Sequence, residues 1–170
     1  MRKRALIIID VQRGLFEKKN EVYKSTELIS NINSIIDVFR KEQEKIIFVQ
    51  HCNNGSLKKD SISWQIHPEI KVKEKDMKIW KNKSNVFKEN KLINYLEKER
   101  IKDLVIVGLV TQGCVQAACI SGKDSGLNIT LIGDAHSNFN KNPKELINHW
   151  NKRLHEHGVR ILNTAELINS

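Results

Sequence analysis

The chain has 170 residues, of which 39% are hydrophobic and 29% charged, and its formal net charge is +9. This length suits one domain with a substantial core, so we expect a single domain over residues 1–170. No apolar run approaches the length of a membrane span, and the lysines are scattered among glutamates instead of forming a dense basic helix. The composition therefore predicts no membrane association and no nucleic-acid partner.

The N-terminal stretch and the cysteines predict the compartment. Only five apolar residues separate the basic start of the chain from Asp10, which is too short for the core of a signal peptide. The three cysteines, Cys52, Cys114 and Cys119, form neither an even set nor a pair with zinc-ligand spacing. We therefore expect a cytoplasmic protein with reduced thiols, without a disulfide framework or a zinc cluster.

Strand-like and helix-like segments alternate along the chain. Short apolar runs predict buried strands over residues 5–9, 46–50, 104–107, 129–132 and 159–162, with a weaker strand at 77–80. Helical spacing predicts helices over residues 25–44, 91–100, 115–126, 143–157 and 164–168, the first capped by Ser25 or Thr26, and loops over 13–24 and 57–68. The alternation predicts a three-layer α/β/α fold with a mostly parallel, doubly wound central sheet.

Chemically active side chains follow several of the predicted strands. They are Asp10, His51, Lys81, Cys114 and His136. In a parallel sheet the carboxyl ends of all strands lie at one edge, where open α/β sheets place their ligands. No segment matches a glycine-rich phosphate loop. The side chains named above make this edge a candidate site for acid, amine and thiol chemistry. The alternative for an isolated aspartate in such a position is a helix or loop cap.

Cys114 stands at the most informative strand-to-helix junction. The strand at 104–107 is expected to end at Gly108, and residues 111–113 supply turn and N-cap chemistry before a helix of short apolar side chains. A thiol in the first turn of a helix lies in the partial positive charge of the helix N-terminus, which favours the thiolate. Free backbone N–H groups in the same turn can hold an oxyanion. The alternative is an inert cysteine in the core.

Three motifs occur along the chain in order: an apolar strand ending in D-V-Q at Asp10–Gln12, K-x-x-x-[SGN]-x-F at Lys81–Phe87, and G-x-x-T-x-x-C-V at Gly108–Val115. A D-A-x-S turn follows at Asp134–Ser137. With these motifs the chain resembles the isochorismatase-like cysteine hydrolases, which include nicotinamidases, N-carbamoylsarcosine amidase and ureidoacrylate amidohydrolase. The V-Q-H, W-x-x-H-P and D-A-H-S patterns are similar to the branch that contains streptothricin hydrolase.

The resemblance implies a catalytic triad of Asp10, Lys81 and Cys114. In such a triad the aspartate accepts the thiol proton, the lysine stabilises negative charge, and the thiolate attacks an electrophilic carbon. The expected reaction is cleavage of a C–N bond in a small amide, lactam or carbamoyl compound through a thioester. The resemblance also implies a cis peptide at Leu109–Val110 and an oxyanion hole formed by the N–H groups of Val110 and Cys114. Lys83 competes with Lys81, because alternate residues of an extended strand point the same way.

The candidates for substrate binding are Gln12, Phe16, His51, Trp64 and Phe87. Core packing or loop anchoring is the alternative for each of them.

Metal-binding nicotinamidases carry an Asp-x-His pair after the second strand, whereas this chain has His51-Cys52-Asn53 there. A zinc-type site built from His51 and His67 would be short of ligands, so we expect neither a metal nor another cofactor.

Two other functions remain open from the sequence. One is a non-catalytic member of the same fold that binds a ligand or serves in assembly, and the other is an isochorismatase-type hydrolase of vinyl ethers. The expected partner is a small-molecule amide, and the resemblance implies a homodimer or homotetramer.

Overall fold

The computed structural model describes residues 3–170, in which six strands form one parallel sheet in the order β3-β2-β1-β4-β5-β6. The strands are β1 (Arg4–Ile9), β2 (Lys45–His51), β3 (Met77–Lys81), β4 (Asp103–Leu109), β5 (Asn128–Ser137) and β6 (Arg160–Leu162). The helices are α1 (Arg13–Phe16), α2 (Ser25–Lys41), α3 (Asn90–Glu99), α4 (Gln116–Asp124), α5 (Pro143–Glu156) and α6 (Thr164–Ile168). A short 3₁₀ turn, η1 (Val86–Lys88), and a π-helical turn, η2 (Thr111–Val115), complete the elements.

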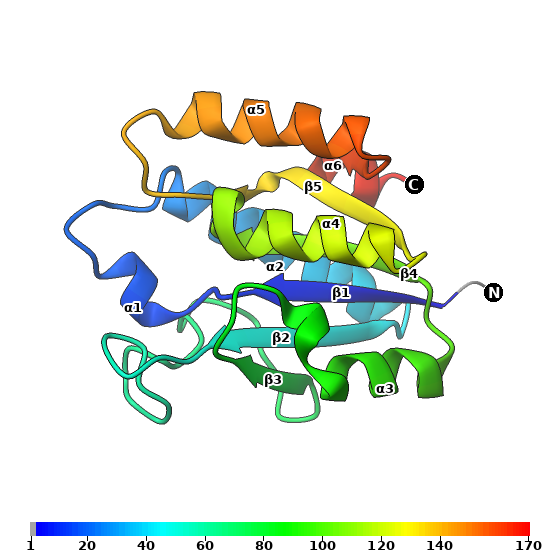
Figure 1. Ribbon diagram of the computed structural model, residues 1–170, viewed down its shortest axis with the longest axis horizontal. Coiled ribbons are helices and arrows are strands. Elements are labelled where there is room, and N and C mark those ends of the chain that lie inside the picture. Colours follow the sequence, from blue (N-terminus) through cyan, green and yellow to red (C-terminus); the bar gives the residue numbers. More distant parts are fainter. Residues whose placement is uncertain (1–2) are drawn as a thin grey trace.

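Helices cover both faces of the sheet. Figure 1 shows α3, α4 and α5 on one face and α2 and α6 on the other. The central strand β1 is buried on both faces, with Leu6 and Ile8 packed toward α2 and Ala5, Ile7 and Ile9 packed toward the opposite layer. Its run of apolar residues does not alternate with polar ones because neither face meets water. The predicted three-layer α/β/α architecture is confirmed.

An apolar stripe on α2 carries much of one core. Leu28, Ile32, Ile35, Ile36 and Phe39 are all buried on the face that meets the sheet. Burying each of these side chains contributes roughly 1.5–3 kcal/mol relative to exposure. This packing joins α2 to one face of the sheet.

The sheet continues through Gly108, where the sequence predicts a break. Gly108 has φ +120°, and a Cβ atom there would lie 2.1 Å from the carbonyl oxygen of Ile9 on the neighbouring strand. Only glycine allows this close approach of two backbones. The glycine therefore keeps β4 against β1 up to the residue before Asp10 instead of ending the strand.

Two other local predictions are wrong. Residues 13–16 form the short helix α1 instead of a loop, because Arg13 N and Gly14 N donate to the carbonyls of Gln65 and Ser63 on a distant segment. Helix α2 starts after Lys24, which adopts a left-handed conformation without a side-chain cap, so neither Ser25 nor Thr26 is the cap.

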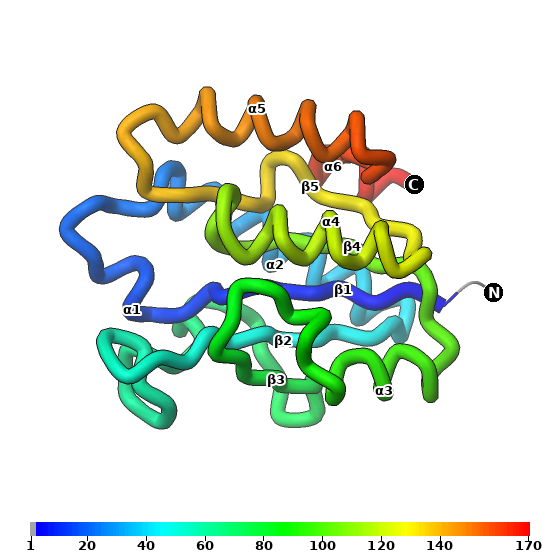
Figure 2. The backbone as a smooth tube through the Cα atoms, viewed as in Figure 1, coloured from blue at the N-terminus to red at the C-terminus, as the bar shows by residue number. Residues whose placement is uncertain are grey.

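The long connection between β2 and β3 folds back beside α1. The tube in Figure 2 follows this segment at the same end of the molecule as α1, and Gln12 forms an isolated bridge with Ile66. The connection therefore borders the carboxyl edge of the sheet. No helix among residues 3–170 is long and apolar enough to cross a membrane.

Candidate functional site

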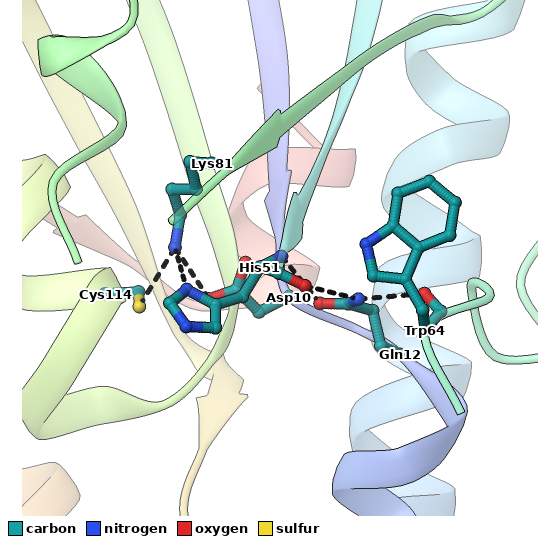
Figure 3. Close-up of polar contacts among 6 residues, drawn as sticks. All are labelled: Asp10, Gln12, His51, Trp64, Lys81 and Cys114. Carbon is teal, nitrogen blue, oxygen red and sulfur yellow. Dashed lines mark hydrogen bonds and ion pairs between the residues drawn. The ribbon is translucent and has the colours of Figure 1, made fainter. Parts of the chain in front are cut away.

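Four side chains converge at the carboxyl edge of the sheet (Figure 3). Lys81 Nζ lies 3.0 Å from Asp10 Oδ2, 3.2 Å from Cys114 Sγ and 3.4 Å from His51 Nδ1. Lys81 is fully buried and Asp10 nearly so. Lys83 is exposed, so of the two candidate lysines the structure places Lys81 in this cluster.

Parallel strand ends bring these groups together. Asp10 directly follows β1 in a left-handed conformation (φ +52°), and its N–H donates to Val49 O at 2.8 Å. His51 and Lys81 end β2 and β3 as register partners, and paired residues of adjacent strands project from the same face of a sheet. Cys114 arrives from the η2 turn after β4.

The segment after Lys81 is anchored to α4. Asn85 Nδ2 donates to Ser121 Oγ at 2.7 Å, and Asn85 Oδ1 accepts from Phe87 N at 2.9 Å. The Phe87 ring lies against Gly122, where a Cβ atom would approach its Cζ to 3.0 Å. Phe87 thus packs about two helical turns beyond Cys114. The ring helps to fix the segment that follows Lys81, and contact of Phe87 with substrate stays a prediction.

The electrostatics of Cys114 are the reverse of the sequence-based expectation. Burial, chiefly, and the negative charge of Asp10 together raise the pKa of the Cys114 thiol to about 12, against the opposing effect of the Lys81 ammonium. The residue also lies in a π-helical turn that contains the non-helical Gly113, not in the first turn of a regular helix. In the free protein the thiol is therefore protonated at neutral pH.

One carboxylate oxygen of Asp10 has no hydrogen-bond partner among the described residues. Its Oδ2 accepts from Lys81, whereas its Oδ1 is buried and has no hydrogen-bond partner among the described residues. A buried oxygen without a donor keeps its lone pairs available for a proton. The site thus combines a protonated thiol with a carboxylate able to act as its base.

Gln12 holds the site together from inside. Its Nε2 donates to the carbonyls of His51 (3.0 Å) and Trp64 (2.8 Å), and its Oε1 accepts from His51 N at 2.8 Å. The residue is fully buried. Its amide is committed to backbone groups and fixes the position of His51, and a role of Gln12 in substrate binding stays a prediction.

Phe16 and Trp64 lie partly buried beside the core on the α2 side of the sheet. The Phe16 ring packs on His67 with 4.6 Å between ring centroids. Trp64 Nε1 is buried without an acceptor among residues 3–170. Contact of these two side chains with substrate stays a prediction.

A metal ion does not fit the residues present. Among the described residues, Asp10, His51 and Cys114 are the set whose ligand atoms all lie within 4.8 Å of one another. The Lys81 ammonium contacts all three side chains, so a positive charge already occupies the position between them that a metal ion would need. His67, the other candidate ligand, packs on Phe16 instead.

His136 belongs to a buried chain of hydrogen bonds that the sequence does not reveal. Its Nδ1 lies 2.9 Å from Thr111 Oγ1 and its Nε2 lies 2.8 Å from Asn151 Oδ1. Asn151 Nδ2 donates to Gly133 O, so Asn151 Oδ1 accepts and the His136 proton is on Nε2. Burial lowers the pKa of His136 to about 4. This chain ties the η2 turn to α5; only the threonine of the third motif hinted at it.

In the turn that carries Cys114, one carbonyl oxygen accepts two backbone hydrogen bonds. Gly113 N and Val115 N both donate to Val110 O, at 3.0 and 3.3 Å. The Leu109–Val110 peptide is cis, as the resemblance implied. The roles of the Val110 and Cys114 N–H groups as an oxyanion hole stay a prediction.

Residues 4–166 match the Isochorismatase domain, so the chain belongs to the isochorismatase family. An uncharacterized isochorismatase family protein of Bacillus subtilis, YrdC, is 26% identical over 98% of this chain and 95% of its own length. Nicotinamidase 3 of Arabidopsis thaliana is 22% identical over 81% of this chain and 74% of its own length. The crystal structure of an isochorismatase family protein superposes with a TM-score of 0.88 at 25% identity, covering 94% of this chain and 98% of that one.

Proposed function

We propose that this isochorismatase-family hydrolase cleaves the C–N bond of a small amide, lactam or carbamoyl compound through a thioester on Cys114. One observation carries the proposal: a single buried ammonium, Lys81 Nζ, contacts both the Asp10 carboxylate and the Cys114 sulfur. A nucleophile beside a base that a third group orients is the general arrangement of covalent catalysis.

Acylation begins with the thiol and the free carboxylate oxygen. As the Cys114 sulfur attacks the substrate carbonyl carbon, its proton passes to Asp10 and the C=O electron pair moves onto oxygen. The carbonyl then re-forms, the C–N bond breaks, and the proton on Asp10 transfers to the leaving nitrogen. Because the proton leaves as the C–S bond forms, a thiol pKa of about 12 in the free protein is compatible with the reaction.

Deacylation uses the same groups. Asp10 removes a proton from a water molecule as the water oxygen attacks the thioester carbon. The C–S bond breaks when the carbonyl re-forms. The departing sulfur takes the proton from Asp10, which restores both groups. The net reaction adds one water across the C–N bond, releasing an acid and an amine or ammonia. Lys81 stays charged throughout and offsets negative charge on the sulfur and on Asp10.

The oxyanion needs donors on the far side of the carbonyl. In this proposal the N–H groups of Val110 and Cys114 donate hydrogen bonds to the oxyanion. They lie beside the turn in which Gly113 N and Val115 N donate to Val110 O. Removing one such donor from an enzyme typically slows the reaction by about 10²–10³-fold. The nicotinamidase relative supports amide chemistry for the family. A homodimer or homotetramer stays part of the proposal.

The test is ammonia release from a panel of small amides by wild-type protein and by Cys114→Ala. We expect turnover to disappear in Cys114→Ala while circular dichroism stays unchanged, and to persist in Cys119→Ala, which changes a fully buried core cysteine on α4. Quenching during turnover should leave the acyl group on Cys114 in a peptide map. Undiminished hydrolysis by Cys114→Ala would refute the mechanism. Tight metabolite binding without hydrolysis would favour the ligand-binding alternative.

A further inference from the structure

The hydrogen bonds of Lys81 determine the protonation of His51. A lysine ammonium has three N–H donors and no acceptor. Its three polar neighbours here are Asp10 Oδ2, Cys114 Sγ and His51 Nδ1. Because the ammonium cannot accept a hydrogen bond, His51 Nδ1 must be the acceptor, and the single proton of the neutral imidazole is then on Nε2.

The Nε2–H group has no partner of its own. His51 is half-buried, and its Nε2 makes no hydrogen bond within residues 3–170. One ring nitrogen of His51 lies within 4.8 Å of a coordinating atom of both Asp10 and Cys114. The His51 ring therefore borders the space beside the Cys114 sulfur, and a substrate whose carbonyl carbon approaches that sulfur brings its neighbouring atoms close to the ring.

We propose that His51 presents Nε2–H as a fixed, neutral donor, and that the site selects small amides with a neutral acceptor, such as a second carbonyl, a few bonds from the scissile carbonyl. The part of this inference that concerns the substrate rests on the proposed function, because that function makes the bound compound an amide. The geometry of the donor stands without it.

The backbone of His51 is held on both sides. Gln12 accepts from its N–H and donates to its carbonyl, and the register pairing with Lys81 fixes its place at the strand end. A donor held in place before binding loses little conformational entropy when substrate arrives, so it discriminates well between ligands with and without an acceptor.

The charges around His51 favour a neutral ligand group. The groups that face it are the Asp10 carboxylate and the Lys81 ammonium, whose charges cancel. Burial lowers the pKa of His51, and the Lys81 charge lowers it further, so the imidazole stays neutral at neutral pH. Protonation would remove the acceptor of Lys81 and place two cations 3.4 Å apart. A hydrogen-bond acceptor without charge suits this environment best.

The first experiment reads the proton directly by ¹⁵N NMR of the histidine side chains, with His51→Gln to assign the His51 signals. We expect His51 in wild-type protein to show a protonated Nε2 and an unprotonated Nδ1. In Lys81→Met the two nitrogens should move toward an average of both tautomers, because the donor to Nδ1 is gone. A proton on Nδ1 in the wild-type protein would overturn the proposal.

The second experiment uses two amides of matched shape on Cys114→Ser, which keeps an acceptor for Lys81 but slows turnover. Acetoacetamide carries a second carbonyl whose oxygen is three bonds from the amide carbon, and 3-methylbutanamide has a methyl branch in place of that oxygen. We expect acetoacetamide to shift the His51 Nε2 signal and to bind about tenfold more tightly, the effect of one neutral hydrogen bond. Equal binding of the two, or no shift of Nε2 at tens of millimolar acetoacetamide, contradicts the proposal.

Variants at position 51 separate the donor from the shape of the ring. His51→Gln places an amide N–H near the position of Nε2 and should keep the preference for acetoacetamide. His51→Leu should reduce it to within twofold. If the tautomer and the preference hold but wild-type protein hydrolyses no amide, the proposed hydrolase fails while this recognition stands. If amides are hydrolysed without any preference that depends on His51, the reverse is true.

The two hydrogen bonds between the Gln12 amide and the backbone of His51 form a clamp on His51. Gln12→Met and Gln50→Met are a matched pair of variants that test this clamp. Both glutamines donate to Trp64 O, at 2.8 and 3.0 Å, but only Gln12 also binds the backbone of His51. We expect Gln12→Met to weaken the preference for acetoacetamide and Gln50→Met to leave it unchanged. Equal effects of the two would show that the Trp64 segment, not the clamp, controls recognition.

Discussion

Removing the positive charge of Lys81 tests whether the central ion pair has the strength that the geometry implies. The Lys81 and Asp10 side chains are 0% and 3% exposed, and their charged atoms lie 3.0 Å apart. Lys81→Met keeps the length of the side chain and leaves the Asp10 carboxylate buried without its cation. Asp10→Asn does the converse with little change of volume.

The magnitude follows from the distance and the burial. At an effective dielectric constant of about 20, two unit charges at this separation attract by roughly 5 kcal/mol. Breaking a buried pair by removing one partner typically costs about 3–5 kcal/mol, because the other charge stays desolvated. The double variant removes both charges and should regain much of this loss. We therefore expect a coupling free energy of about 3–5 kcal/mol between the two substitutions.

Urea unfolding at pH 7, followed by tryptophan fluorescence, measures the four free energies of the cycle. Lys71 and Asp37 supply a control of identical chemistry, since they form an ion pair whose side chains are 54% and 55% exposed. Lys71→Met and Asp37→Asn should couple by less than about 1 kcal/mol. A coupling at Lys81 and Asp10 as small as that of the exposed pair would refute the account of this site as a strong buried pair.

Three further outcomes are expected. Because burial raises the pKa of Cys114 to about 12, its alkylation by iodoacetamide should accelerate about tenfold per pH unit from pH 7 to 10, and a plateau near pH 7 would contradict this. The pKa of His136 is about 4 in the folded protein and 6.5 when unfolded, so the stability due to the neutral ring is complete above pH 6.5 and is lost as the pH falls toward 4. Urea titrations should show a loss about 3 kcal/mol larger in wild type than in His136→Asn, and parallel curves would count against it. Gly108→Ala should destabilise by more than about 3 kcal/mol in thermal melts, because its Cβ meets Ile9 O, whereas Gly126→Ala, with φ +79° and open space, should cost about 1–2 kcal/mol; similar losses would disprove the steric argument.

The alternation of apolar runs and helical periodicity was enough to predict the layered parallel fold, because these signals depend on residues close together in the chain. The same topology places the ends of β1, β3 and β4 at one edge, so Asp10, Lys81 and Cys114 could be named as neighbours before any coordinates. The choice between Lys81 and Lys83 could not be settled from the sequence, since both point the same way in an extended strand. Burial of one and exposure of the other decides it.

The properties that make the cluster reactive come from contacts between distant residues. The pKa of the Cys114 thiol is raised because the fold buries it and places Asp10, more than a hundred residues away, beside it. Gln12 and Phe87 have the residue types of pocket walls. In the fold, however, the Gln12 amide hydrogen-bonds to the backbone of His51 and the Phe87 ring packs against Gly122. The sequence by itself determined which chemical groups reach the edge of the sheet. Only the tertiary structure decided their protonation and partners, because desolvation and hydrogen bonding depend on what the fold brings into contact.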